Sequence, residues 1–145
     1  MFAVERQRFA ISLGSVVRVL PAAAVTLVPG APAGVMGVVD VHGEIIPVID
    51  LRHQLCRPSF PLRVDDQFLI VRSRRRTLAL RVDETVGVLE YSCQDLVDLP
   101  ELDADAPHAR AALRLDDGLI LIQDVEAVLS ADELDLLDEA LGHPS

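Results

Sequence analysis

Short apolar runs rich in β-branched residues, each ended by Gly, Pro, Asp or another turn-forming residue, recur along the whole chain. Runs of this length and spacing are typical of strands in an all-β sandwich or barrel. The sequence predicts strands at 2–4, 9–13, 16–20, 25–28, 36–41, 45–49, 68–72, 77–82, 85–90 and 119–123. The 145 residues suffice to bury the core of one domain, so a mainly β single domain is expected.

Two of these strands carry different burial patterns. Residues 45–49 are apolar on both faces, which predicts a central strand. In 77–82 the larger apolar residues alternate with Ala79 and Arg81, which predicts a strand with one buried face.

The longest uncharged stretch, 19–39, has the length of a membrane-spanning helix. It contains three prolines and three glycines, which would leave backbone groups unpaired in lipid, so strand, turn and strand in water are expected. Charged residues interrupt the start of the chain where an export signal would be apolar, and the two cysteines lack paired spacing. We therefore expect a cytoplasmic protein.

The best helical signal lies near the end of the chain. Ser130 and Glu133 form a capping box, which predicts a helix over 131–141 that Gly142 ends. Shorter helical turns are predicted after Asp50, a candidate N-cap, and after Ser92.

A pattern of strand, glycine turn, apolar strand and Asp occurs at 39–50 and returns at 113–124. Two similar hairpins predict two small barrels or sheets in one chain. Between the hairpins, the acidic and Pro-containing segment 98–107 predicts an exposed loop.

The net charge of −10 disfavours nucleic acid and anionic membranes as partners, because an acidic surface repels both. All 13 basic residues are Arg, and the only cluster is at 72–76, where a hairpin tip is expected. A solvated tip is the favoured interpretation of this cluster, and an acidic protein partner is the alternative.

A search for reactive groups predicts no enzyme, no metal site and no cofactor. Ser15 lacks the second glycine of a nucleophile elbow, and a hairpin turn explains it. His53 and Cys56 are one helical turn apart but have no further ligands nearby in sequence, and Asp103 and Asp105 lack the rest of a calcium loop.

The segments 28–32 and 43–52, together with Gly37 between them, resemble the chemotaxis coupling protein family CheW. The run Gly-Glu-Ile-Ile-Pro-Val-Ile-Asp-Leu-Arg at 43–52 is fairly specific to that family. Further matches follow in order at 9–11, at 82–88, around Gly118 and at 129–138, so the similarity covers nearly the whole chain.

The resemblance implies two small five-stranded SH3-like β-barrels in one domain over 2–141, with a short C-terminal α-helix and a tail at 142–145. It also implies a non-enzymatic scaffold that couples methyl-accepting chemotaxis receptors to a CheA-type histidine kinase. In the family, the regulatory domain of the kinase associates barrel to barrel, and the helical tip of the receptor docks in an apolar groove. The alternatives are a CheW-like module of another two-component pathway, controlling motility or development, and a small enzyme or ligand-binding barrel.

By the same resemblance, Val16, Gly37 and Val86 match groove positions that receive the receptor helix. Three other matching residues are expected to have structural roles on physical grounds. Gly43 suits a turn, Pro47 suits a strand edge or bulge, and Asp50 suits a helix cap.

Three residues depart from the family pattern and are expected to set partner specificity. Arg18 stands where the family commonly has Glu, and His42 replaces the Arg of the family's Asn-Leu-Arg-Gly, with Asp40 in place of the Asn. One hypothesis is that Arg18 pairs with Asp40 across the groove wall, which would preserve the local charge balance while presenting a different pattern to the receptor.

Overall fold

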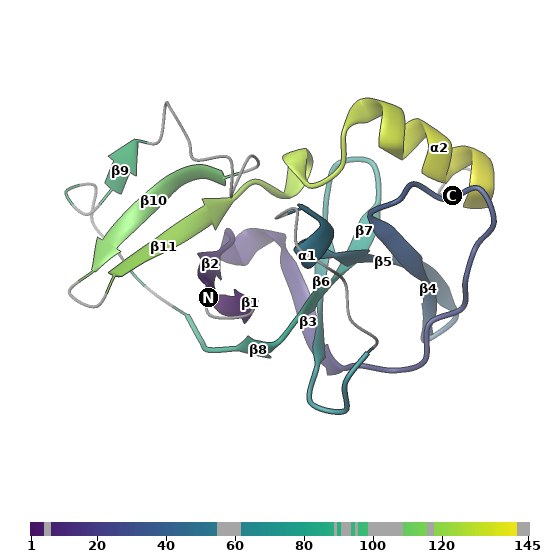
Figure 1. Cartoon of the computed structure of the whole chain (residues 1–145), viewed down its shortest axis with the longest axis horizontal. Coiled ribbons are helices and arrows are strands. Elements are labelled where there is room, and N and C mark those ends of the chain that lie inside the picture. The colour runs from purple at the N-terminus through teal and green to yellow at the C-terminus, as the bar shows by residue number, and fades with distance from the viewer. Residues whose placement is uncertain are drawn as a thin grey trace.

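The computed structural model describes residues 1–4, 7–54, 62–88, 90, 94, 96–98, 109–115 and 118–141, and it is mainly β (Figure 1). The strands are β1 (Phe2–Val4), β2 (Gln7–Ala10), β3 (Val16–Pro21), β4 (Val35–Val41), β5 (Glu44–Asp50), β6 (Gln67–Arg72), β7 (Thr77–Val82), β8 (Glu84–Thr85), β9 (Leu96–Asp98), β10 (Ala109–Leu115) and β11 (Gly118–Gln123). The helices are α1 (Leu51–Gln54) and α2 (Ala131–Leu141), with 3₁₀ turns at Leu13–Ser15 and Val125–Ala127.

A five-stranded sheet in the order β3-β6-β7-β5-β4 has apolar residues buried on both faces. On one face, Ile49 and Leu80 belong to a large core shared with β1, β2 and α2. On the other face, Val48 and Ala79 belong to a smaller core whose buried residues come from this sheet. The prediction that 45–49 forms a central strand is therefore confirmed, because β5 lies between β7 and β4.

A second sheet in the order β8-β1-β2-β11-β10-β9 completes the fold. Figure 1 shows β1 and β2 between the β10–β11 hairpin and the five-stranded sheet. The two sheets agree with the predicted pair of SH3-like barrels, although each has two unjoined end strands within the described residues. The second sheet has six strands rather than five because the short β8 and β9 extend its two edges.

The predicted repeat of two glycine-turn hairpins is confirmed by the topology. In each hairpin the second strand also pairs in parallel with a strand outside it, β5 with β7 and β11 with β2. An aspartate at the end of β5 and another just after β11 each accept a hydrogen bond from the amide two residues on. The Asp50 carboxylate accepts from Arg52 N at 3.0 Å, and the Asp124 carboxylate accepts from Glu126 N at 3.0 Å. The predicted cap at Asp50 is thus confirmed, and Asp124 has the same role.

Several predicted strands have different limits in the structure. The strand expected at 9–13 ends at Ala10, because a 3₁₀ turn follows, and the strand expected at 25–28 is reduced to one bridge between Thr26 and Val38. The strand expected at 85–90 is the two-residue β8. The strand β9 was not predicted, because its three residues are too short for a periodic signal.

Four features named from the sequence lie outside the described residues. They are the helical turn predicted after Ser92, the loop at 99–107, the helix stop at Gly142, and Cys56.

The prediction that 77–82 buries one face was wrong, because Arg81 is fully buried inside the five-stranded sheet. Its guanidinium lies 2.9 Å from an oxygen of Asp66 and 3.7 Å from an oxygen of Asp50, so both faces of β7 are covered. A buried arginine is tolerated only when it is paired in this way, and sequence alternation does not reveal the partners.

The C-terminal helix α2 has the predicted limits, and its capping box is formed: Glu133 N donates to Ser130 Oγ at 3.1 Å, and Ser130 N donates to Glu133 Oε1 at 3.0 Å. The helix packs on the tip of the β6–β7 hairpin, where Leu137 is fully buried in the large core. No helix in the described part of the chain is both long and apolar enough to cross a membrane.

The arginine cluster at the β6–β7 tip is not simply solvated, because α2 supplies an acidic partner within the chain. Arg75 Nη2 lies 2.6 Å from Asp138 Oδ2 and 3.1 Å from Asp135 Oδ1, and Arg76 Nη2 lies 3.0 Å from Asp138 Oδ1. Burial alone would raise the pKa of the Asp138 carboxyl, but its hydrogen bonds with Arg76 and Arg75 outweigh that effect and lower the pKa. The same contacts raise the pKa of Arg75.

Candidate functional site

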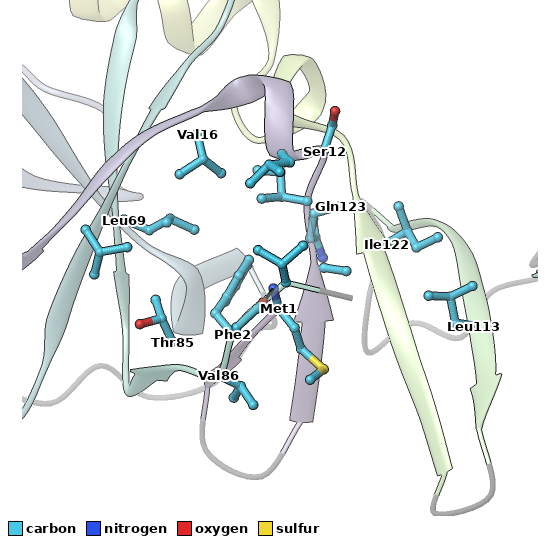
Figure 2. A pocket seen from close by; sticks show the side chains of 16 residues that line it. Met1, Phe2, Ser12, Val16, Leu69, Thr85, Val86, Leu113, Ile122 and Gln123 are labelled. Atoms are coloured by element: carbon cyan, nitrogen blue, oxygen red, sulfur yellow. Dashed lines mark hydrogen bonds between the residues drawn. The ribbon is translucent and has the colours of Figure 1, made fainter. Parts of the chain in front are cut away.

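An apolar groove of about 600 Å³ lies between the two sheets (Figure 2). One wall comes from β3 and β6, the other from β2, β10 and β11, and the segment that follows β8 closes one side. The lining residues are Met1, Phe2, Ala10, Ile11, Ser12, Leu13, Val16, Val19, Leu69, Thr85, Val86, Gly87, Val88, Leu113, Ile122 and Gln123. None of these residues has a charged side chain, but Met1 carries the α-amino group of the chain.

Four large apolar residues of the lining remain exposed. The exposed fractions are 64% for Leu13, 40% for Val19, 51% for Val86 and 73% for Val88. Single exposed apolar residues are common on protein surfaces, but a contiguous group around a concave site marks a place where another molecule binds. The groove is therefore the candidate functional site.

A β-bulge in β3 turns two valines toward this groove. Val16 pairs with Val71 and Val19 pairs with Leu69, although a regular strand would place residues three apart on opposite faces. The register shift between Val16 and Arg18 brings Val16 and Val19 to the same face, because a bulge adds one residue to the strand. Since directly paired residues share a face, Val16 and Val19 both lie on the face of Leu69. Val16, which the resemblance assigned to a groove position, therefore lines this groove.

The same bulge places Arg18 on the opposite face of β3. Arg18 pairs with Ile70, whose side chain belongs to the smaller core, and it is exposed at the sheet edge. Arg18 does not line the groove, and no ion pair joins it to Asp40 within the described residues. The two residues lie on β3 and β4, at opposite ends of the strand order. The structure does not support the hypothesis of a charge pair across the groove wall.

Asp40 and His42 instead shape the β4–β5 turn, away from the groove lining. The Asp40 carboxylate accepts a hydrogen bond from Gly43 N at 2.8 Å. His42 has a φ of 52° and Gly43 a φ of 87°, which is the geometry of a type I′ hairpin turn. Both Asp40 and His42 are exposed, so their predicted effect on partner specificity would act at the hairpin and not in the groove.

Gly37 is buried in β4 and does not line the groove either. Its φ is 152°, and a Cβ at this position would lie 2.3 Å from the carbonyl oxygen of Thr26. The glycine therefore permits the close approach that forms the Thr26–Val38 bridge. Its evident role is structural, like that of Gly43.

Val86 lines the groove, and its backbone is hydrogen-bonded to the first residue of the chain. Val86 N donates to the Met1 carbonyl oxygen at 2.8 Å, and the Met1 amino group donates to the Gly87 carbonyl oxygen at 2.7 Å. Partial burial lowers the pKa of this amino group, because desolvation disfavours its charged form. One residue earlier, Thr85 donates to Gln67 Oε1 through both its amide at 2.7 Å and its hydroxyl at 3.0 Å.

The groove offers apolar contact and neutral hydrogen-bonding groups rather than reactive chemistry. Its polar side chains are Ser12, Thr85 and Gln123, and it holds no acid–base pair. No group of three potential metal ligands gathers anywhere in the described part of the chain. Sequence reasoning missed Leu13, Val88 and Gln123, because the first two were assigned to strands that end before them and the third to no role.

Comparisons with known proteins agree with this geometry. A family model described as the CheW-like domain matches residues 1–133. The chain is 27% identical to a probable chemotaxis protein CheW of Rhizobium etli and 27% identical to the chemotaxis protein CheW of Bacillus subtilis, in each case over 91% of this chain and 86% of the relative. It is 32% identical to the protein PilI of Pseudomonas aeruginosa over 66% of this chain and 54% of that protein. The crystal structure of the scaffolding protein TtCheW from Thermoanaerobacter tengcongensis matches with a TM-score of 0.81 and 20% identity, over 91% of each chain.

Proposed function

The chain belongs to the CheW-like domain family, and on that premise we propose that it is a non-enzymatic scaffold that couples methyl-accepting chemotaxis receptors to a CheA-type histidine kinase. The relatives over nearly its whole length are chemotaxis proteins, and the similar solved structure is a scaffolding protein.

The observation that carries this proposal is the exposed apolar groove between the sheets. An amphipathic helix binds by placing its apolar face in such a groove, with anchors spaced three and four residues apart. The receptor tip is helical, so we assign it to the groove, with Val16 and Val86 among its contacts. The kinase regulatory domain would then bind elsewhere on the β surface, which leaves both partners attached at once.

One observation favours a second candidate function within the same class. The similarity to the protein named PilI, at 32% identity, is to a relative whose name differs from that of the CheW proteins. The chain would then serve a different two-component pathway with a dedicated receptor or kinase. The two candidates share the groove and differ in the partners that occupy the two surfaces.

The test is calorimetric titration of the purified chain with a soluble helical-hairpin fragment of a receptor and, separately, with the kinase regulatory domain. We expect both to bind, and we expect Val16→Asp to lose the receptor fragment while it keeps the kinase domain. The matched control is Val64→Asp, because Val64 is 97% exposed and lies outside the groove. Unchanged receptor binding by Val16→Asp would contradict the proposal. Repeating the titrations with partners from each pathway separates the two candidates.

A further inference from the structure

The last residue of β11, Gln123, places a buried amide in the wall of the apolar groove. Its side chain is only 7% exposed, and it lines the groove together with Ile122 and Leu113. Figure 2 shows it among the apolar side chains of the lining. The amide is not sealed from solvent, so water in the open groove can satisfy its hydrogen-bonding atoms. A ligand that covers the groove would displace this water, and the amide would then need a partner on the ligand.

The other polar groups of the groove differ from Gln123. The amide and hydroxyl of Thr85 are both satisfied by Gln67 Oε1, at 2.7 and 3.0 Å. Ser12 is exposed, so water can satisfy its hydroxyl. Gln123 differs from both, because its side chain is mostly buried in the wall and its amide opens onto the groove.

The backbone around Gln123 is paired on both sides of the residue, which fixes where its side chain leaves the groove wall. Gln123 pairs with Ala109 in the β10–β11 ladder, and the next residue, Asp124, caps the following 3₁₀ turn through its bond from Glu126 N at 3.0 Å. A side chain that starts from a fixed backbone loses less conformational freedom when it binds a ligand than one on a mobile loop.

We propose that Gln123 determines the specificity of the groove by hydrogen bonding to a neutral side-chain amide on the apolar face of the docked helix. This inference rests on the proposed function, since it needs a helix in the groove. A carboxamide has an NH₂ donor and a carbonyl acceptor. The side chain of an Asn or Gln on the helix can therefore pair with both the Oε1 acceptor and the Nε2 donor of Gln123. A charged side chain matches poorly beside Gln123, because no described side chain of the lining is charged and the Met1 amino group already donates to the Gly87 carbonyl oxygen at 2.7 Å.

The same reasoning predicts which helices the groove rejects. A helix with a wholly apolar face would exclude water from Gln123 and leave its amide unpaired. An unpaired buried amide lowers affinity by about 10- to 100-fold relative to a matched partner. Discrimination of this kind comes from the group left unpaired rather than from extra contact area.

The experiment is a double-mutant cycle measured by calorimetry with the soluble receptor hairpin as the probe. Wild type and Gln123→Leu are titrated with the native hairpin and with variants in which each Asn or Gln on its docking face is replaced singly by Leu. We expect Gln123→Leu to bind the native hairpin about 10-fold more weakly, and we expect one hairpin variant to abolish that difference. If Gln123→Leu unfolds, Gln123→Met keeps the side-chain length and gives the same test.

The matched control is Gln7→Leu, because the Gln7 amide donates to the carbonyl oxygen of Arg8 at 2.9 Å and does not line the groove. Equal or tighter binding of every hairpin by Gln123→Leu would overturn this inference while leaving the proposed function intact, provided that Val86→Asp still loses binding. No binding of the hairpin by wild type would overturn both.

Discussion

The groove and the β6–β7 tip differ in what the fold does with their side chains. At the tip, Arg75 and Arg76 are paired with carboxylates of α2, and Leu137 fills the core beneath them. In the groove, Val86 and Val88 are more than half exposed. The tip looks like a binding surface in the sequence, yet the chain occupies it itself.

This difference shows that a cluster of one charge in a sequence is weak evidence for a partner. The acidic residues that complete the tip lie about 60 positions later, at the separations of Arg75 from Asp135 and Asp138. Exposed ion pairs contribute little free energy, whereas a covered apolar surface contributes in proportion to its area. The groove is therefore where binding energy is available, and the tip is where α2 is fixed.

The largest expected effect separates the two regions through stability. Leu137→Ala should lower the free energy of unfolding by about 2–5 kcal/mol, because it removes a fully buried leucine from the large core. Chemical denaturation monitored by circular dichroism measures this change. Affinity per folded molecule for a groove ligand should stay close to that of wild type. A destabilisation below about 1 kcal/mol would contradict the packing of α2, and Leu136→Ala, at a position 47% exposed, is the control.

The next effect concerns the groove alone. Val88→Ser should weaken binding of a receptor hairpin by about 10-fold, because a valine side chain contributes roughly 1.5 kcal/mol or more when it becomes buried. Stability should change little, since Val88 is 73% exposed in the free protein. Titration calorimetry measures the affinity, and thermal unfolding checks the stability. A large loss of stability without a change in affinity would mean that Val88 supports the fold instead of the ligand.

A smaller effect concerns pH at the tip. The contacts of Asp138 hold its pKa below the ordinary value, so the folded state binds this proton less readily than the unfolded state. The resulting stability is fully present above the ordinary carboxyl pKa and is lost as the pH falls through the folded value. Asp138→Asn should lower stability by about 1 kcal/mol at neutral pH, and the difference from wild type should shrink in acid. Urea denaturation at pH 7 and pH 3 measures both, and a difference that grows in acid would contradict the account.

The smallest effect is the response of the groove to salt. Raising the ionic strength from about 0.05 to 0.5 M should change hairpin affinity by no more than about 2-fold, because the described lining has no charged side chain and its α-amino group, at Met1, already donates to a carbonyl oxygen. Fluorescence anisotropy with a labelled hairpin measures this dependence. A steep fall in affinity with salt would show that charged residues outside the groove supply much of the binding.

The sequence predicted elements well where a local signal was complete. The capping box at Ser130 and Glu133 defined α2 to the residue, and the repeat around Asp50 and Asp124 predicted two related hairpins. It could not predict what depends on contacts between distant segments. Arg81 is buried because Asp66 and Asp50 come close to it, and no alternation of residues indicates that pairing.

The site was predicted in part, and the reason is again the register of the strands. Val16 and Val86, two of the residues that the resemblance singled out, line the groove, and their role in binding stays a prediction. Arg18 was expected on the same wall, but the bulge beside it reverses the faces, and a bulge has no signature in this sequence. Gln123 was missed because one polar residue at the end of an apolar run resembles an ordinary strand end.

The central claim is that partners bind through the groove and not through the arginine tip. The most direct measurement is a parallel titration of a receptor hairpin against Val86→Asp and against the double variant Arg72→Glu/Arg74→Glu, with Ile45→Asp as the control. Ile45 and Val86 are both 51% exposed, but Ile45 lies outside the groove lining. The account predicts that Val86→Asp loses about 100-fold in affinity, while the other two variants stay within about 3-fold of wild type. Loss of binding by the arginine variant, with Val86→Asp unchanged, would contradict it.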